Sequence, residues 1–379
     1  MSGFRIKLLA KLLQNVTIKI IKCNNFYMKT LTKRQEQILN IIRENEPVST
    51  KHIKQNLEKN WGELNRITVV RDLDVLLKKE MIKKEGKGRG TYYRTKTANK
   101  LLQYFNPDNY FQAPPDERGV KDTFDFNVFQ YFSDELFSPE ELKELDKLND
   151  NYRRRVDQLN EEQLKKEFER LTIELSWKSS RIEGNTYSLI DTEILLKENK
   201  EAEGHTREEA QMIINHKKAL DYILDKKNDF QKLNTRNIED LHKLVVDKMD
   251  VETNFRKRLV GITGTKFKPL DNQHQIKEAM EEMIEIANNK DLHPLLRSMA
   301  CLLLTSYIQP FEDGNKRTAR LLGNAVLLAH DYCPLSYRSV NESDYKKATL
   351  LFYEQNSALF FKELFTEQCQ FSLNNYFLL

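Results

Sequence analysis

The sequence has few of the residues from which disulfide frameworks and metal centres are built. Its 379 residues include four cysteines, Cys23, Cys301, Cys333 and Cys369, with no C-x-x-C pair, and seven histidines without ligand spacing. Scattered cysteines of this kind are typical of free thiols in a reducing compartment, and they argue against a disulfide frame or a zinc site. The cysteine pattern therefore predicts a cytoplasmic protein.

Long hydrophobic runs are also missing. Hydrophobic residues make up 39% of the chain and charged residues 31%, which is typical of a soluble, helix-rich protein. No stretch is long and apolar enough for a membrane span, so we expect no membrane partner. The formal net charge of +4 is too small to indicate a partner by itself. The length of the chain predicts two or three domains.

Residues 1–28 contain no acidic residue and mix lysines with leucine and isoleucine. Lysine interrupts the apolar runs every few residues, so the segment fits neither a membrane span nor a secretory leader. A basic amphipathic surface helix is one alternative. Because Met28 stands directly before the first well-formed domain, we expect this basic extension to be dispensable.

Residues 29–96 predict three helices followed by two strands. Thr32 and Gln35 give the first helix a capping-box-like start. Ser49 opens the second helix, and the third begins near Arg66. The strands, at residues 81–84 and 91–96, enclose the basic turn Gly86-Lys87-Gly88-Arg89-Gly90. This order of elements resembles the winged helix-turn-helix domains of many bacterial regulators.

That resemblance implies a DNA-binding surface. Arg66, Thr68 and Arg71 of the third helix would enter a major groove, and Lys87 and Arg89 of the wing would contact backbone phosphates. Phosphate contacts alone supply only salt-sensitive, nonspecific affinity. Winged helices also serve as protein-interaction modules, and this alternative stays open.

A connector follows at residues 97–138. It loses helical and strand periodicity and combines several prolines with many aromatic residues. A purely flexible linker would not be so aromatic. We therefore expect the connector to lie against one or both of its neighbouring domains.

Residues 139–183 contain no glycine or proline after Pro139, which predicts one long helix ending at Gly184. Ser179 and Glu183, four residues apart, share a face of that helix. A glutamate at the end of an ordinary helix is the plain interpretation of Glu183. A second interpretation of Glu183 depends on the loop at residues 307–324.

The most informative stretch is YIQPFEDGNKRTARLLGN, residues 307–324, in which a polar turn separates two apolar helical segments. A loop that opens into a helix presents free N–H groups and the positive end of the helix dipole, which favours anions. Lys316, Arg317 and Arg320 add positive charge, and Asp313 could hold a magnesium ion. The stretch predicts either a phosphate site or a capped core helix with a solvated basic face.

This loop resembles the signature His-Pro-Phe-x-Asp/Glu-Gly-Asn-Gly-Arg-x-x-Arg of the Fic (Fido) family. Members of that family are all-helical enzymes that move part of a nucleotide, usually AMP from ATP, onto a hydroxyl of another protein. The resemblance implies that Asp313 holds the Mg²⁺ that bridges the phosphates. It further implies that Gly314 and Asn315 wrap the α-phosphate and that Arg317 and Arg320 pair with the outer phosphates. ATP, Mg²⁺ and a protein target with a Ser, Thr or Tyr hydroxyl are the expected cofactors and partner.

Two residues depart from the signature. Gln309 stands where the family has its histidine, and an amide has no proton affinity near neutral pH, so Gln309 cannot act as a general base. Loss of a base typically lowers the rate by a factor of about 100 to 10,000. Lys316 replaces the second signature glycine, as in the Doc branch of the family, whose members transfer the γ-phosphoryl group with the nucleotide reversed. The identity of the transferred group therefore stays open.

Two further segments resemble family elements. SSRIEGN resembles the inhibitory motif Ser/Thr-x-x-x-Glu-Gly/Asn, which implies that Glu183, in the motif Ser179 to Gly184, reaches into the nucleotide site and pairs with Arg320. Residues 255–269 alternate and turn at Gly264, which predicts a hairpin similar to the family's flap. There, strand addition along four residues would hold the target: Val260, Gly261, Ile262 and Thr263.

The sequence thus predicts a mainly α protein: a winged helix-turn-helix domain before an all-helical Fic domain, residues 139–379, with a small β-hairpin flap and an inhibitory helix near residues 160–184. Three functions stay open. The first is an autoinhibited adenylyltransferase of weak or altered activity. The second is a catalytically silent Fic-fold regulator that binds DNA and senses nucleotide or peptide, and the third is Doc-like phosphotransfer. Oligomerisation also stays open.

Overall fold

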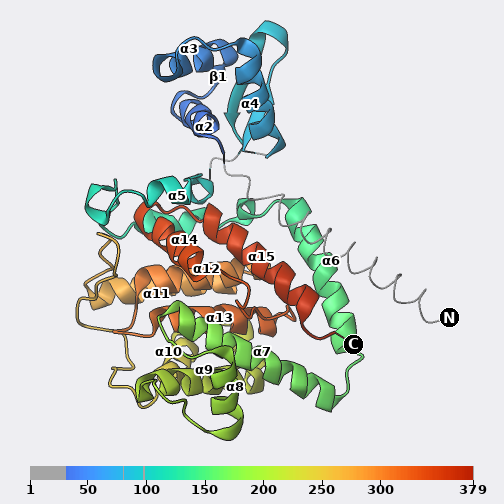
Figure 1. Ribbon diagram of the computed structural model, residues 1–379, viewed down its shortest axis with the longest axis vertical. Coiled ribbons are helices and arrows are strands. Elements are labelled where there is room, and N and C mark those ends of the chain that lie inside the picture. The colour runs from blue at the N-terminus through green and yellow to red at the C-terminus, as the bar shows by residue number, and fades with distance from the viewer. Residues whose placement is uncertain (1–30, 80, 97–98, 379) are drawn as a thin grey trace, which may run out of the picture. The chain divides into compact units, whose positions relative to one another are not determined.

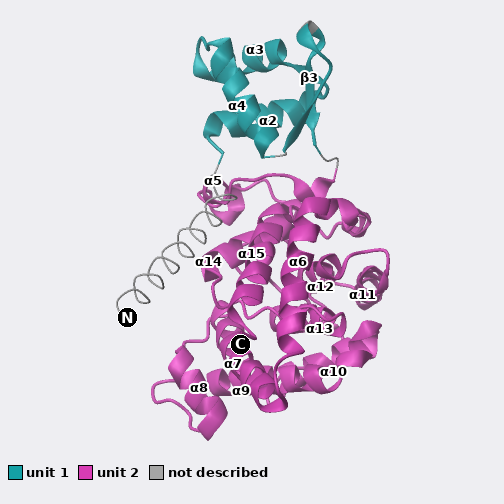
Figure 2. Cartoon of the chain, turned by 90° about the vertical axis from the view of Figure 1, so that its right-hand side faces the viewer, with its two compact units in different colours: residues 1–98 teal, residues 99–379 magenta. Residues whose placement is uncertain are grey.

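The computed structural model describes residues 31–79, 81–96 and 99–378 (Figure 1). The chain divides between residues 98 and 99 into two compact units (Figure 2). The basic extension at residues 1–28 lies outside the described residues. The fold is mainly helical, as the sequence predicts.

The first unit has the order of elements of a winged helix, which confirms that prediction. The predicted hairpin is present, and a short strand that the sequence did not predict joins it to form an antiparallel sheet with β3 in the centre, in the order β1-β3-β2. The elements are α2 (Lys33–Asn45), β1 (Val48–Ser49), α3 (Thr50–Trp61), α4 (Arg66–Lys78), β2 (Ile82–Glu85) and β3 (Tyr92–Thr95).

Polar contacts fix the start of α2 and join it to α4. The predicted capping box is present, since the Gln35 amide N–H donates to Thr32 Oγ1 over 3.3 Å and the Thr32 N–H donates to Gln35 Oε1 over 3.1 Å. The buried carboxylate of Asp72 on α4 then accepts hydrogen bonds from Arg34 Nε and Gln35 Nε2. The third helix is thereby held against the first, with its opposite face toward solvent.

The second unit is a helical bundle built around α12 (Pro294–Ile308), in which every residue from Leu295 to Ile308 is buried. The helix α13 (Asn315–Ala329) follows it after a tight loop and packs along it (Figure 1). The surrounding helices of more than one turn are α6 (Pro139–Val156), α7 (Glu161–Ile182), α8 (Leu189–Glu198), α9 (Arg207–Asp225), α10 (Thr235–Val245), α11 (Gln273–Asn288), α14 (Glu342–Gln355) and α15 (Leu359–Asn375). None of the described helices is long and apolar enough to cross a membrane.

The prediction of one continuous helix over residues 139–183 is wrong. The helix α6 ends at Val156 and α7 begins at Glu161, because Asn160 caps α7 in a capping box with Gln163, with hydrogen bonds of 2.9 and 3.0 Å. The Arg155 guanidinium also donates to the carbonyl oxygens of Leu373 and Phe377, which fixes the end of α6 near the C-terminus of the chain. The capping box at Asn160 starts a new helix and so separates α7 from α6 without a glycine or proline.

The aromatic connector packs on the second unit as short helical turns. Phe129 and Phe132 belong to its hydrophobic core. Arg118 is buried and donates to both carboxylate oxygens of Glu354 on α14, over 2.7 and 3.0 Å. It also donates to the carbonyl oxygen of Gly264, over 2.6 Å. The connector therefore braces the loop that was predicted as the flap.

The predicted β-hairpin flap is not formed as paired strands. Residues 251–272 form no helix or strand: a turn lies at Thr263 and Gly264, and no β-ladder joins the two arms. Their polar groups bond elsewhere: Gly264 accepts from Arg118, and the Lys268 N–H donates to the Asp122 carbonyl over 2.9 Å. Strand pairing is replaced by contacts with the connector, which periodicity along the sequence does not reveal.

Candidate functional site

The signature loop occupies the turn between α12 and α13. Gln309 ends α12 in the left-handed region, with φ +51°, and Gly314 begins α13 with φ +76°. A Cβ atom added to Gly314 would lie 3.0 Å from Val246 Cγ1 and 3.3 Å from Val245 Cγ1 on α10. Glycine is therefore required at residue 314 both by the backbone conformation and by the close approach of α10.

Asn315 holds the loop closed from inside. Its Oδ1 accepts a hydrogen bond of 2.8 Å from the Phe311 N–H, and its Nδ2 donates to the Phe311 carbonyl over 2.8 Å and to Gln309 Oε1 over 3.1 Å. The family resemblance implies that Gly314 and Asn315 wrap the α-phosphate. Both side-chain amide hydrogens of Asn315 are already engaged here, so in this conformation its side chain shapes the loop and has no hydrogen left for a ligand.

Gln309 is 8% exposed, and both ends of its side-chain amide are bonded. Its Nε2 donates to the Ser306 carbonyl over 2.6 Å, and its Oε1 accepts from Asn315. An amide fixed in this way can neither take up a proton nor turn freely toward a substrate.

His242 on α10 packs against the signature loop and bonds to its backbone. Its ring stacks on Phe311 with centroids 3.6 Å apart, and its Nε2 lies 2.9 Å from the Asp313 carbonyl oxygen. Because a carbonyl oxygen only accepts, Nε2 carries the hydrogen. Burial lowers the pKa of His242 to about 4, so the ring is neutral near pH 7.

Arg256 fixes the loop from the other side. It is 1% exposed, its Nε donates to the Gln309 carbonyl over 2.6 Å, and its other nitrogens donate to the carbonyls of Arg258 and Leu270. Its own N–H donates to the Pro310 carbonyl over 2.9 Å. One guanidinium thus joins the candidate flap to the signature loop.

The three predicted cations gather on the first turns of α13. Arg317 is almost fully buried and forms an ion pair of 3.1 Å with Asp313. Arg320, fully buried, donates from Nε to Ser179 Oγ and from Nη2 to the Ser179 carbonyl, both over 2.8 Å. Lys316 is partly exposed. These groups and the N-terminus of α13 make a strongly positive site.

Glu183, at the end of α7, enters this positive site. Its Oε1 lies 2.8 Å from Arg320 Nη1, and its Oε2 lies 3.6 Å from Lys316 Nζ. Burial by itself would raise the pKa of the carboxyl, but Arg320 and Lys316 outweigh that effect and lower the pKa below its ordinary value. Glu183 is therefore ionised near pH 7, and it occupies the cations that a phosphate would need.

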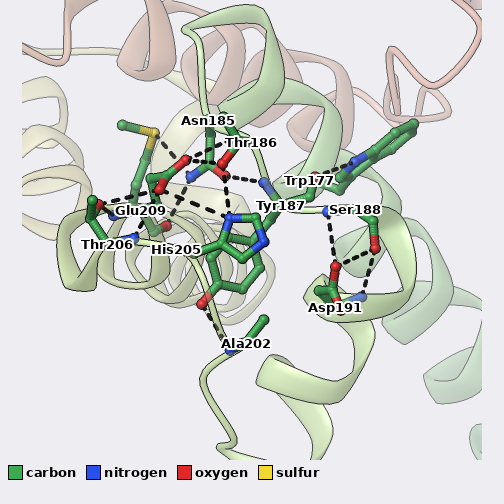
Figure 3. A network of polar contacts seen from close by, with 11 residues as sticks. Trp177, Asn185, Thr186, Tyr187, Ser188, Asp191, Ala202, His205, Thr206 and Glu209 are labelled. Carbon is green, nitrogen blue, oxygen red and sulfur yellow. Dashed lines mark hydrogen bonds and ion pairs between the residues drawn. The ribbon is translucent and has the colours of Figure 1, made fainter.

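A polar network holds the segment that follows Glu183 (Figure 3). Glu209 Oε1 on α9 accepts from the Thr186 N–H and Oγ1, over 2.7 and 2.6 Å. These bonds, with those from Thr206, lower the pKa of Glu209 to about 2. The Asn185 amide donates to the Glu209 carbonyl over 2.9 Å, and Thr186 Oγ1 also lies 2.8 Å from His205 Nδ1. The C-terminal end of α7 is thus tied to α9.

Asp313 fits a magnesium ion that arrives with a nucleotide. Its carboxylate is 64% exposed on the loop, and among the described residues no cluster of three or more His, Cys, Asp or Glu side chains could hold a metal by itself. Mg²⁺ in proteins commonly takes one or two carboxylates together with substrate phosphates and water. The residues present therefore suit a nucleotide-bound ion and do not suit a resident one.

The predicted DNA-binding residues belong to α4 and to the wing between β2 and β3. Arg66 and Arg71 on α4 are exposed, Thr68 is partly exposed, and Lys87 projects from the wing. None of these three cations takes part in the ion pairs found in the described part of the unit. The side chain of Arg89 lies outside the described residues.

The predicted flap residues are accessible. Gly261 and Thr263 are exposed, and Val260 and Ile262 are partly buried. Next to them Leu259 is 74% exposed. The backbone of Val260 to Thr263 has no ladder partner of its own.

Sequence reasoning missed His242 and Arg256. His242 lies 67 residues before Gln309, and no ligand spacing marks it in the sequence. Arg256 had a weak signal in the Phe-Arg pair at residues 255–256. Its three carbonyl partners become visible only in the folded chain.

Known protein families match segments of each of the two units. Residues 232–327 match the Fic/DOC family, and residues 31–111 match the penicillinase repressor family. Two curated relatives are proteins named protein adenylyltransferase Fic. That of Culex quinquefasciatus is 28% identical over 46% of this chain, and that of Aedes aegypti is 29% identical over 46%. Each match spans only 35% of the relative's own length.

Solved structures share the fold of the second unit. Fic-1 of C. elegans, residues 134–508, matches 62% of this chain and 70% of its own with a TM-score of 0.53 at 18% identity. A Fic domain containing signaling protein from Bacteroides thetaiotaomicron matches 62% of this chain and 95% of its own with a TM-score of 0.51 at 22% identity. The chain therefore carries a Fic/DOC family domain preceded by a winged-helix domain of the penicillinase repressor type.

Proposed function

We propose that this protein binds ATP with Mg²⁺ at the start of α13, and that it is an autoinhibited relative of the protein adenylyltransferases with weak activity. The observation that carries the proposal is the ion pair of 2.8 Å between Glu183 and Arg320. Arg320 is buried near the N-terminus of α13, a combination that suits a phosphate. The carboxylate of Glu183 takes the place of that phosphate here.

Each part of the substrates would contact particular residues of this chain. Arg317 and Arg320 would pair with phosphate oxygens after Glu183 withdraws, and Gly314 and Asn315 would offer backbone N–H groups. Asp313 would exchange its pair with Arg317 for the magnesium ion, which neutralises phosphate charge when bound. A protein target would lie along Val260 to Thr263, where backbone without a ladder partner could add a strand.

Gln309 limits the rate in this proposal. Its amide is bonded to Ser306 and Asn315 and accepts no proton, so deprotonation of the target hydroxyl has no general base at this position. Positioning and charge stabilisation would still support slow transfer.

A silent regulator is the second candidate, and two observations favour it. The signature histidine is replaced by Gln309, and the first unit presents Arg66, Arg71 and Lys87 to solvent without ion-pair partners among its described residues. In this case nucleotide or peptide binding at the second unit would alter binding of DNA through α4 and the wing.

Doc-like phosphotransfer is the third candidate. Lys316 replaces a glycine of the signature, and its Nζ lies 3.6 Å from Glu183 Oε2. A cation in that place would favour a different phosphate pose from the one that suits AMP transfer.

ATP labelled at either the α- or the γ-phosphate separates the three candidates. We would compare wild type, Glu183→Gly and Gln309→His with a mixture of candidate protein targets. Transfer by Glu183→Gly with Gln309 intact supports the enzyme, and the label that is transferred names the group. Label on protein only after Gln309→His supports the silent regulator. Absence of Mg-ATP binding by Glu183→Gly in calorimetry would overturn the first and third candidates and would leave the silent regulator only as a peptide sensor.

A further inference from the structure

A cavity lies at the N-terminal end of α12, the opposite end of that helix from the signature loop. It has a volume of about 500 Å³ and is lined by Asp134, Leu142, residues 290–294, Leu296 and Arg297. His293 caps α12 beside it. Twelve residues of helix separate Arg297 from Gln309, or roughly 18 Å at 1.5 Å per residue, so this cavity is separate from the candidate nucleotide site.

Arg297 is the unusual residue in this cavity. It is 5% exposed, and its side chain forms no hydrogen bond or ion pair with any residue that the structure describes, while its Nε is fully buried. Other buried arginines of the unit have hydrogen-bond or ion-pair partners. Arg256 donates to three carbonyls, Arg118 is bonded to Glu354, and Arg320 pairs with Glu183 and Ser179. A buried Nε without a partner is costly, because its N–H has lost water and gained no acceptor.

The groups around Arg297 do not supply a counter-charge. Burial raises the pKa of the Cys301 thiol to about 12, so the thiol is neutral. The Asp146 carboxylate is taken by Tyr332, whose hydroxyl donates over 2.7 Å, and by His293 Nε2 at 3.1 Å.

The two acids that line the cavity leave Arg297 unpaired as well. Asp134 and Asp291 are exposed to water, and neither forms an ion pair with Arg297. His293 Nδ1 accepts from the Leu295 N–H over 3.3 Å, so this ring is neutral and fully bonded. The cavity therefore offers one unneutralised guanidinium, the exposed Lys290 at its rim and the N-terminus of α12.

We propose that this cavity binds a small molecule through an oxyanion group, a carboxylate or a phosphate, that pairs with Arg297. A planar guanidinium matches either group with two parallel hydrogen bonds. The positive end of α12 adds to the attraction, and Lys290 supplies a second cation. A volume of about 500 Å³ suits a small metabolite.

Calorimetric titration of the full chain with inorganic phosphate, and separately with acetate, tests the proposal. The ionic strength is held constant with chloride. We expect at least one of the anions to bind wild type, Arg297→Lys to bind several-fold more weakly, and Arg297→Met to lose binding. Arg153→Met, which removes an exposed arginine from α6, is the matched control and should bind as wild type does. The anion that binds identifies the group.

Thermal unfolding without ligand gives a readout that a purely structural role of Arg297 would not produce. If the charge awaits a ligand, Arg297→Met raises the melting temperature of the ligand-free protein, whereas loss of a structural contact lowers it. A crystal soaked in selenate, a heavier oxyanion, should show an anomalous peak at Arg297, which separates this cavity from the signature loop. Equal anion binding by wild type and Arg297→Met, or no binding by wild type, overturns the proposal. Neither result affects Mg-ATP binding by Glu183→Gly, so the two proposals fail separately.

Discussion

Glu183 Oε1 lies 2.8 Å from Nη1 of Arg320, while the Nε and Nη2 of the same guanidinium are held by Ser179. Ser179 on α7 and Glu183, one helical turn later at the end of α7, therefore contact the same guanidinium on α13 through different nitrogen atoms. The arrangement positions Arg320 and occupies it at the same time.

Removal of the carboxylate should open the site. We expect Glu183→Gly to bind Mg-ATP about tenfold more tightly than wild type or better, which corresponds to about 1.4 kcal/mol or more, because the internal competitor for Arg320 is gone. Isothermal titration calorimetry measures the change. Glu161→Gln, at the exposed start of α7, is the control. Equal affinity of wild type and Glu183→Gly would show that Glu183 does not close the site.

Ser179 should stabilise the second unit through Arg320. We expect Ser179→Ala to lower the free energy of unfolding by about 1–3 kcal/mol, because the buried guanidinium loses an acceptor. Ser180 supplies a matched control. It is equally buried, but its hydroxyl has no hydrogen-bond partner among the described residues, so Ser180→Ala should cost little. Calorimetric unfolding of both variants makes the comparison, and similar losses would contradict the assignment.

Gly314 should not tolerate a side chain. Gly314→Ala would place Cβ 3.0 Å from Val246 Cγ1 and force an L-residue to φ +76°. We expect a destabilisation of about 2–4 kcal/mol from the combined strain and overpacking. Gly261→Ala is the control, since open space surrounds Gly261 and its φ is not in the left-handed region. Unfolding in denaturant measures both variants, and a Gly314→Ala chain as stable as the control would refute the close approach of α10.

His242 should make stability depend on pH between about 4 and 6.5. The folded-state pKa is lowered to about 4 from an ordinary value of 6.5. Below pH 6.5 the unfolded chain takes up a proton that the folded chain does not, so stability falls as the pH decreases to about 4. The loss reaches at most about 3 kcal/mol.

A non-titrating variant isolates this contribution. Gln in place of His242 can still donate to the Asp313 carbonyl, so His242→Gln should flatten the slope of stability against pH in that window. The exposed His274→Gln controls for the loss of one imidazole. His216, fully buried near Arg320 and with a pKa lowered well below its ordinary value, adds a similar slope that both variants keep. An unchanged slope in His242→Gln would contradict a neutral, buried ring.

The first unit should bind DNA through α4 and the wing. We expect the full chain to bind duplex DNA with an affinity that falls as salt rises. Arg71→Ala should lower the slope of log K against log salt by about 0.9 if Arg71 contacts one phosphate. Arg153→Ala in the second unit is the control. Fluorescence anisotropy across a salt series provides the measurement, and a wild-type chain without salt-dependent binding would favour the protein-interaction alternative.

The sequence by itself determined the elements that depend on local patterns. Capping residues and apolar periodicity predicted the winged helix, α12 and α13, and the signature letters placed the turn at Gly314. Ser179, Glu183 and Arg320 were singled out by motif, and their contact is present. Local rules suffice here because helix caps, periodicity and tight glycine turns involve residues only a few positions apart.

Tertiary structure decided what depends on distant partners. The unpaired arms of the predicted flap and the support of the loop by His242 and Arg256 arise from residues far apart in the chain. The unpartnered state of Arg297 is of the same kind. Its sequence shows only an arginine in an apolar helix, and the missing counter-charge is a property of everything that folds around it. Burial and electrostatic pairing are set by the whole packed unit, so no local pattern encodes them.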